Sequence, residues 1–188
     1  MLHYATLISL AAVSGAALAQ PAIIIEVDDP VLLRGESTTV TMSASYGGID
    51  YAVAGIETRM LNVGGTWSDL VLLSPMDGAG TFPGVVSGTG VDGIAAGQIN
   101  FHSTYADPTN PIAFWQATYT APADAAAPFV VDLSTMTSRY DVYLERSSSQ
   151  SVSRLGELIE GSATITIIPA PASVLTLGGG MLAPRRRR

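Results

Sequence analysis

The chain contains no cysteine and no lysine, and only two of its 188 residues are histidine. The absence of cysteine excludes disulfide bonds and thiolate nucleophiles, and it leaves too few ligands for a usual zinc site. Once an N-terminal leader is removed, His102 is the only histidine, and no serine lies in a nucleophile-elbow pattern. We interpret His102 as a residue at the edge of a strand, and we do not expect nucleophilic catalysis.

Long hydrophobic runs are also missing, and the two short ones lie at the ends of the chain. Residues 7–18 are apolar and overlap Ala17-Leu18-Ala19, a small-x-small pattern that predicts signal-peptide cleavage between Ala19 and Gln20. The run is too short for a spanning helix with water on both sides. We therefore expect residues 1–19 to be a signal peptide of an exported protein.

The C-terminal run is preceded by two prolines and followed by arginines. Pro169 and Pro171 fix φ and remove two backbone donors, so this stretch is expected to be extended and exposed. The apolar residues 174–183 can enter a bilayer, and the chain ends in Arg185, Arg186, Arg187 and Arg188. Such a basic cluster is expected to stay on the cytoplasmic side of a membrane.

This order of a proline motif, a short apolar segment and an arginine cluster resembles the PEP-CTERM sorting signal. Pro169, Ala170 and Pro171 match the Pro-Glu-Pro element, with Ala170 in place of the glutamate, and the four terminal arginines match the basic terminus. The resemblance implies that residues 169–188 are a sorting tail that is recognised by an exosortase, a membrane protease-transpeptidase. It also implies transient contact with the inner membrane, and final residence at the cell surface or in the extracellular matrix of a biofilm.

The region between the two terminal signals, residues 20–168, is strongly acidic. It holds all 16 Asp and Glu residues but only five arginines, which gives a net charge near −11. Such a surface repels nucleic acid and anionic membranes. It is compatible with calcium, with hydrated polysaccharide or simply with solubility, and its size of about 150 residues suits one domain.

Short β patterns recur along this region, and no long amphipathic helix is apparent. In residues 37–45 polar and apolar residues alternate, so that Val40, Met42 and Ala44 are expected to face the core. Glycine and proline in residues 74–93 predict a long loop with at most one short strand, near Val85. The remaining patterns predict strands at residues 23–27, 53–63, 67–73, 94–101, 112–120, 129–133, 138–144 and 162–168, and a single helical turn within 155–160.

Eight or nine short strands predict an all-β fold in which two antiparallel sheets pack face to face. The first strand, the Asp28-Asp29-Pro30 break and the threonine-rich second strand resemble the start of immunoglobulin-like and cohesin-like sandwiches. A jelly roll would satisfy the same pattern. We therefore expect an antiparallel β-sandwich over residues 20–168.

Carboxylates and aromatic residues supply the candidate ligand sites. Asp28 and Asp29 are candidate calcium ligands, since calcium prefers oxygen donors, but turn capping explains the same residues. Two carboxylates gathered in a cleft would be needed for glycoside hydrolysis. Trp67 and Trp115 are candidate platforms for sugar stacking, with Tyr105 among the other available rings, unless these rings fill the core.

The function predicted from these features is adhesive or structural, without catalysis and without a required cofactor, with calcium as a candidate ion. The expected partners are the exosortase and either a polysaccharide or a surface protein. The alternative is a small secreted protein that binds or cleaves carbohydrate. A third interpretation is a calcium-stabilised module that polymerises through exposed sheet edges.

Overall fold

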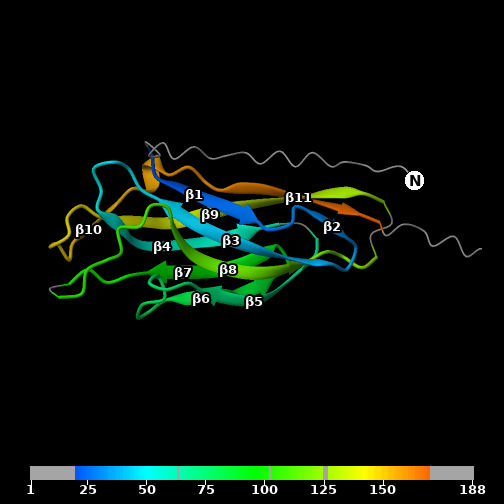
Figure 1. Ribbon diagram of the computed structural model, residues 1–188, viewed down its shortest axis with the longest axis horizontal. Helices are drawn as coiled ribbons and strands as arrows, with labels where there is room; N and C mark the ends of the chain where they lie inside the picture. The colour runs from blue at the N-terminus through cyan, green and yellow to red at the C-terminus, as the bar shows by residue number, and fades with distance from the viewer. Residues whose placement is uncertain (1–19, 63, 102, 125–126, 170–188) are drawn as a thin grey trace, which may run out of the picture.

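The structure is a computed structural model that describes residues 20–62, 64–101, 103–124 and 127–169. Two β-sheets pack face to face, as Figure 1 shows. Within the described residues, no helix is long and apolar enough to cross a membrane. The elements are β1 (Ala22–Val27), β2 (Val31–Leu33), β3 (Ser37–Ser45), β4 (Ala52–Leu61), β5 (Thr66–Leu72), β6 (Phe82–Ser87), β7 (Gly90–Gly97), β8 (Ile112–Thr120), β9 (Phe129–Tyr143), β10 (Ser151–Ser153), the 3₁₀ turn η1 (Leu155–Glu157) and β11 (Ser162–Ile168).

The smaller sheet has four antiparallel strands in the order β1-β3-β8-β5. Its inner face follows the alternation of β3, because Val40, Met42 and Ala44 are completely buried. The predicted core positions of this strand are therefore confirmed. The bounds of β3, β8 and β11 also agree with the sequence pattern, since each of these strands has a regular period of two over most of its length.

A bulge in β8 changes which of its aromatic residues face the core. Met42 of β3 pairs with Trp115, whereas the next residue, Ser43, pairs with Ala113, so Phe114 is an extra residue in β8. Strict alternation would send Phe114 and Trp115 to opposite faces. The bulge brings both rings to the inner face, and both are completely buried.

The larger sheet has seven strands, with the path β2-β11-β9-β4-β7-β6 and β10 paired to β9. Its β2–β11 pair is parallel, which corrects the expectation of purely antiparallel sheets. In this pair Val31 lies opposite Thr166, and Leu32 packs in the core. The polar segment 147–153 likewise contributes a short strand, β10.

The strand β9 is one continuous element, although the sequence pattern predicted two. Glu57 of β4 pairs with Arg139 and the following Thr58 pairs with Thr137, so Ser138 is extra and forms a bulge. The bulge shifts the alternation, which explains why the pattern looked interrupted near this point. The polar residues before Ser138 are side chains within a strand, not a loop.

The segment 74–93 is the largest departure from the predicted strand pattern. It was expected to be mostly loop, but it contains all of β6 and the start of β7. The strand β5 is mostly exposed, and Trp67 is its only buried residue. The described part of the chain therefore has eleven strands, more than the eight or nine predicted, and the two-sheet sandwich itself is confirmed.

Candidate functional site

The two outer faces of the sandwich differ in chemistry. The outer face of the four-stranded sheet carries uncharged polar side chains over β3, β8 and β5, among them Thr39, Thr118 and Ser68, which pair in one row across the three strands. The outer face of the seven-stranded sheet instead carries apolar and charged side chains around β9, β4 and β7. This second face is also where the molecule is hollowed.

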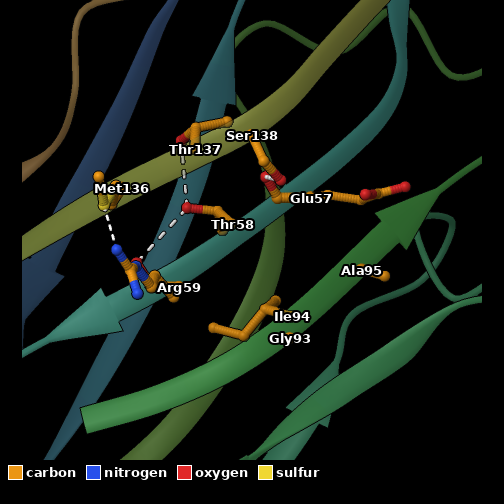
Figure 2. Close-up of a pocket in the computed structure, with 9 residues that line it drawn as sticks. All are labelled: Glu57, Thr58, Arg59, Gly93, Ile94, Ala95, Met136, Thr137 and Ser138. Carbon is orange, nitrogen blue, oxygen red and sulfur yellow. Dashed lines mark hydrogen bonds between the residues drawn. The ribbon is translucent and has the colours of Figure 1, made fainter. Parts of the chain in front are cut away.

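The hollow lies between three neighbouring strands and has a volume of about 380 Å³. Its lining residues are Glu57, Thr58, Arg59, Gly93, Ile94, Ala95, Met136, Thr137 and Ser138, which Figure 2 shows as sticks. Met136 is 52% exposed, whereas Ile94 is completely buried. The Arg59 guanidinium lies against the Met136 sulfur, so the arginine covers one side of this apolar floor.

Opposite charges form the rim of this hollow. The Arg139 guanidinium lies 2.6 Å from a carboxylate oxygen of Asp141 and 3.3 Å from one of Glu57. Hydrogen bonding to Asp141 is the main reason why the pKa of Arg139 is raised above its usual value. A single guanidinium thus joins two neighbouring strands, β4 and β9.

A hydrogen-bond network around the exposed Glu160 holds the β9 bulge beside the hollow. Glu160 accepts hydrogen bonds from the Thr135 hydroxyl at 2.6 Å, the Thr137 hydroxyl at 2.8 Å and the Thr137 backbone N–H at 2.7 Å. Thr137 also contacts the Thr58 hydroxyl at 3.1 Å. Hydrogen bonds to a carboxylate are stronger than neutral ones, so the backbone behind Met136 is firmly held.

A second hollow adjoins the first along β4 and β7, since Glu57 and Ala95 line both. It has a volume of about 230 Å³ and is lined largely by glycine and alanine, including Gly55, Gly78 and Gly97. Together the two hollows form one continuous depression, which we call the sheet groove. One end of the groove is apolar, at Met136, and the other exposes small residues and backbone.

Trp67 and Trp115 do not form a sugar platform. Both are buried, and their ring centroids lie 5.9 Å apart in the core. The Trp115 Nε1 donates to the Pro83 backbone oxygen at 2.9 Å, and the Trp67 Nε1 donates to the Asn62 Oδ1 at 2.8 Å. Because each indole is enclosed and its N–H is satisfied within the fold, the prediction that these rings bind ligand is wrong.

Asp28 and Asp29 lie on the exposed link between β1 and β2. Asp29 Oδ1 accepts a hydrogen bond from the Val31 backbone N–H at 3.0 Å, which is the turn-capping role. The described residues contain no group of three or more His, Asp or Glu side chains that could hold a metal ion. Calcium binding at Asp28 and Asp29 stays a prediction.

Most of the predicted sorting residues lie outside the described residues. These are Ala19, Ala170, Pro171 and the four terminal arginines, and His102 also belongs to this group. Gln20 is exposed just before β1, and Pro169 follows the last residue of β11. The signal-cleavage and sorting assignments therefore remain predictions.

The sheet groove was not predicted from the sequence. Most of its residues come from β4, β7 and β9, with others from the link between β5 and β6 and from the chain after β7, and the bulges at Ala54 and Ser138 decide which side chains share a face. An exposed methionine within an otherwise polar run, Thr135-Met136-Thr137, is the one local signal that could have marked it.

No family model matches the sequence, and no curated protein does. The structure is similar to the seventh type I cohesin of ScaB from Pseudobacteroides cellulosolvens, with 12% identity and a TM-score of 0.57 over 83% of this chain and 96% of the cohesin. A cohesin module of a family 33 glycoside hydrolase from Clostridium perfringens gives 10% identity and a TM-score of 0.51, covering 81% and 100%. The sixth cohesin of scaffoldin B from Acetivibrio cellulolyticus, solved in complex with a dockerin, gives 12% identity and a TM-score of 0.51, covering 79% and 99%. At these identities the likeness concerns the fold, and the chain has a cohesin-like β-sandwich fold.

Proposed function

We propose that this protein is an exported, non-catalytic binding module that attaches a partner protein to the outer face of its seven-stranded sheet. The observation that carries the proposal is the sheet groove, with an exposed apolar floor at Met136 and a charged rim. The Acetivibrio cohesin, which has a similar fold, was solved in complex with a protein partner, a dockerin. We infer the same general use, protein attachment, for this chain.

The chemistry of the groove favours a protein partner. An exposed apolar floor surrounded by charges is the arrangement of interface hot spots, where one inserted side chain supplies most of the binding energy. Arg59 and Arg139 offer planar donors, and Glu57 and Asp141 offer acceptors, so both signs of charge are available for pairing. Because the domain carries a net charge near −11, a basic partner would also be attracted over a distance.

Export and sorting form the second half of the proposal. The signal peptide, residues 1–19, would direct the chain out of the cytoplasm, and the tail, residues 169–188, would hold it briefly in the inner membrane for an exosortase. Released at the cell surface or into the extracellular matrix, the sandwich would present its groove to another surface protein. The role is adhesive or structural, and turnover of any member of a glycan panel by the purified domain would contradict it.

The groove is tested by placing a photo-crosslinking amino acid at Met136 and, as a matched control, at Val71. Both side chains are exposed apolar residues, but Val71 belongs to β5 on the opposite sheet. We expect crosslinking to one discrete surface protein from Met136 only. That protein should then bind the Met136→Glu variant at least tenfold more weakly than the Val71→Glu variant, since a charge would be buried on the apolar floor. Equal crosslinking from both positions, or equal affinities, would rule the groove out as the docking site.

A further inference from the structure

A hairpin at one end of the sandwich is held by buried side-chain amides. It consists of residues 98–101 and 103–106, and it follows β7. Asn100 is 2% exposed; its Nδ2 donates to the Glu145 and Ser148 carbonyls at 3.1 and 2.7 Å, and its Oδ1 accepts from the Ala106 N–H at 3.1 Å. One side chain therefore fixes the hairpin to the loop of residues 144–150. We call the hairpin and this loop the tip.

Further hydrogen bonds clamp the base of the hairpin. Gln98 donates to the Val53 carbonyl at 2.7 Å and accepts from the Asp107 N–H, also at 2.7 Å. The Tyr143 hydroxyl donates to the Gln98 carbonyl at 3.1 Å, and the Tyr51 hydroxyl donates to the Ala106 carbonyl at 3.0 Å. Since buried polar groups are costly unless paired, so complete a network gives the hairpin a single conformation.

The tip exposes large apolar side chains, three from the hairpin and Leu144 from the loop. Ile99 is 53% exposed, Phe101 62%, Tyr105 46% and Leu144 42%. A rigid loop that exposes aromatic and aliphatic side chains is typical of a binding surface, because a loop that is already ordered loses little conformational entropy when a ligand binds. Neighbouring hydroxyls from Ser103, Thr104 and the serines of the loop add adaptable hydrogen-bonding groups.

Arg146 is the charged group of the tip that is open to a ligand. Its guanidinium lies over the Tyr105 ring, 4.2 Å from the centroid, and among the described residues it forms no ion pair with a carboxylate. By contrast, Arg139 pairs with Asp141 and Glu57, and Arg154 pairs with Asp50 at 2.8 Å. A stacked guanidinium keeps its planar fork of donors free, which matches a carboxylate.

We propose that the tip binds a polysaccharide that carries carboxylate groups, a polyuronate. The Arg146 fork would pair with the carboxylate of one sugar, while the exposed rings would stack on the apolar faces of its neighbours. Residues 98–106 contain no Asp, Glu or Arg, and the loop contributes one Glu and one Arg, so the tip is locally neutral within an acidic domain. At physiological salt the more distant carboxylates are largely screened.

This site meets the sheet groove only at its glycine-rich end, because Gln98 and Ile99 of the hairpin also line the second hollow, whereas no residue of the tip lines the first hollow at Met136. The tip is built from the chain between β7 and β8 and the chain between β9 and β10, and both form loops at the same end of the sandwich in Figure 1. The strand β11 ends at the opposite end, where the chain continues into residues 169–188. A polysaccharide at the tip would therefore leave the Met136 end of the groove and the end of β11 accessible, and the inference does not depend on the protein-binding proposal.

The test measures binding of the purified domain to polygalacturonate and to its methyl ester, which keeps the sugar backbone but removes the charge. We expect binding to polygalacturonate that weakens about tenfold or more for the methyl ester and for Arg146→Gln, because charge-assisted hydrogen bonds are lost. Tyr105→Ala should weaken binding to both polymers. Arg34→Gln is the matched control, since Arg34 is an exposed arginine after β2, at the other end of the sandwich.

Three outcomes would overturn the proposal. The first is no detectable binding of polygalacturonate by the folded wild-type domain. The second is equal binding of polygalacturonate and its methyl ester, or equal loss in Arg146→Gln and Arg34→Gln. The third is that the domain binds no polyuronate but sediments with phosphatidylcholine vesicles, and that Arg146→Gln sediments equally well. This result would assign the exposed apolar side chains to a lipid surface.

Discussion

Buried tyrosine hydroxyls are the residues on which the core depends most at high pH. The Tyr140 hydroxyl donates to the Ser45 carbonyl at 2.7 Å, and the Tyr119 hydroxyl donates to the Gly64 carbonyl at 3.3 Å. Both side chains are completely buried, and Tyr119 packs edge-on against Trp67. Burial raises the pKa of Tyr119 to about 12 and the pKa of Tyr140 still further, the latter with help from the nearby Asp50 charge.

We predict that stability falls as the pH rises from about 10 to about 12. Above pH 10 an unfolded tyrosine loses its proton while the folded one retains it, so the unfolded state binds fewer protons. Each rise in pH therefore stabilises the unfolded state relative to the folded state. The measurement is the urea midpoint across this pH range. Tyr119→Phe should flatten the decline while costing stability at neutral pH through its lost hydrogen bond. A decline that Tyr119→Phe and Tyr140→Phe both leave unchanged would contradict this origin.

Two single residues also explain why the predicted sugar platform was wrong. Trp67 and Trp115 look alike in the sequence whether they line a core or a surface, because both uses place an aromatic ring in a strand. The fold decides between the two uses. Phe114 is an extra residue in β8, so that both Phe114 and Trp115 face the core, and Trp67 packs against Trp115. By contrast Tyr105, which follows no strand pattern, is the ring that the fold leaves exposed.

At the scale of elements, the turn between β6 and β7 depends on one glycine. Gly90 has a φ of 137°, and a Cβ at this position would lie 1.9 Å from the Met60 carbonyl oxygen of β4. Both the backbone conformation and the space therefore require glycine. Gly88, in the same turn, has no atom within 4 Å of its ideal Cβ and no positive φ.

We predict that Gly90→Ala costs about 2 kcal/mol or more of unfolding free energy, because β4 and β7 would have to separate at their shared end. Gly88→Ala should change stability by less than about 0.5 kcal/mol. Urea unfolding of both variants at neutral pH compares them directly. Equal unfolding free energies for the two alanine variants would show that the close approach of Gly90 to β4 does not contribute to stability.

How much of each element could be predicted depends on how regular its alternation is. The strands β3, β8 and β11 follow a period of two and were predicted with the correct bounds. The strand β6 was expected only as one short strand near Val85, and the start of β7 was missed, because glycine and proline, which signal loops, serve here in an edge strand and in tight turns. The strand β9 appeared divided because the Ser138 bulge shifts its alternation, and the same bulge positions Met136, so the groove was missed for the same reason.

At the scale of the whole molecule, β11 closes the domain. Ile165 and Ile167 are completely buried, and the strand pairs with β9 on one side and β2 on the other. Its last residue, Ile168, accepts a hydrogen bond from the Arg34 backbone N–H at 3.2 Å. Among the described residues the strand pairing of the sandwich ends at Ile168, and the domain boundary that the sequence placed before the proline motif stays a prediction.

We predict that removal of residues 169–188 leaves the melting temperature of the domain unchanged within about 2 °C, since the pairing of β11 with β2 and β9 lies within residues 162–168. Truncation after Gly161, which removes β11, should instead abolish folding because it uncovers the apolar edge of β9. In cells, the shorter deletion should leave a folded protein that is no longer sorted to the surface. If surface display were unchanged, the sorting role of Pro169 and the residues after it would be wrong; if the deletion unfolded the domain, the boundary at Ile168 would be wrong, so the two halves of the interpretation fail separately.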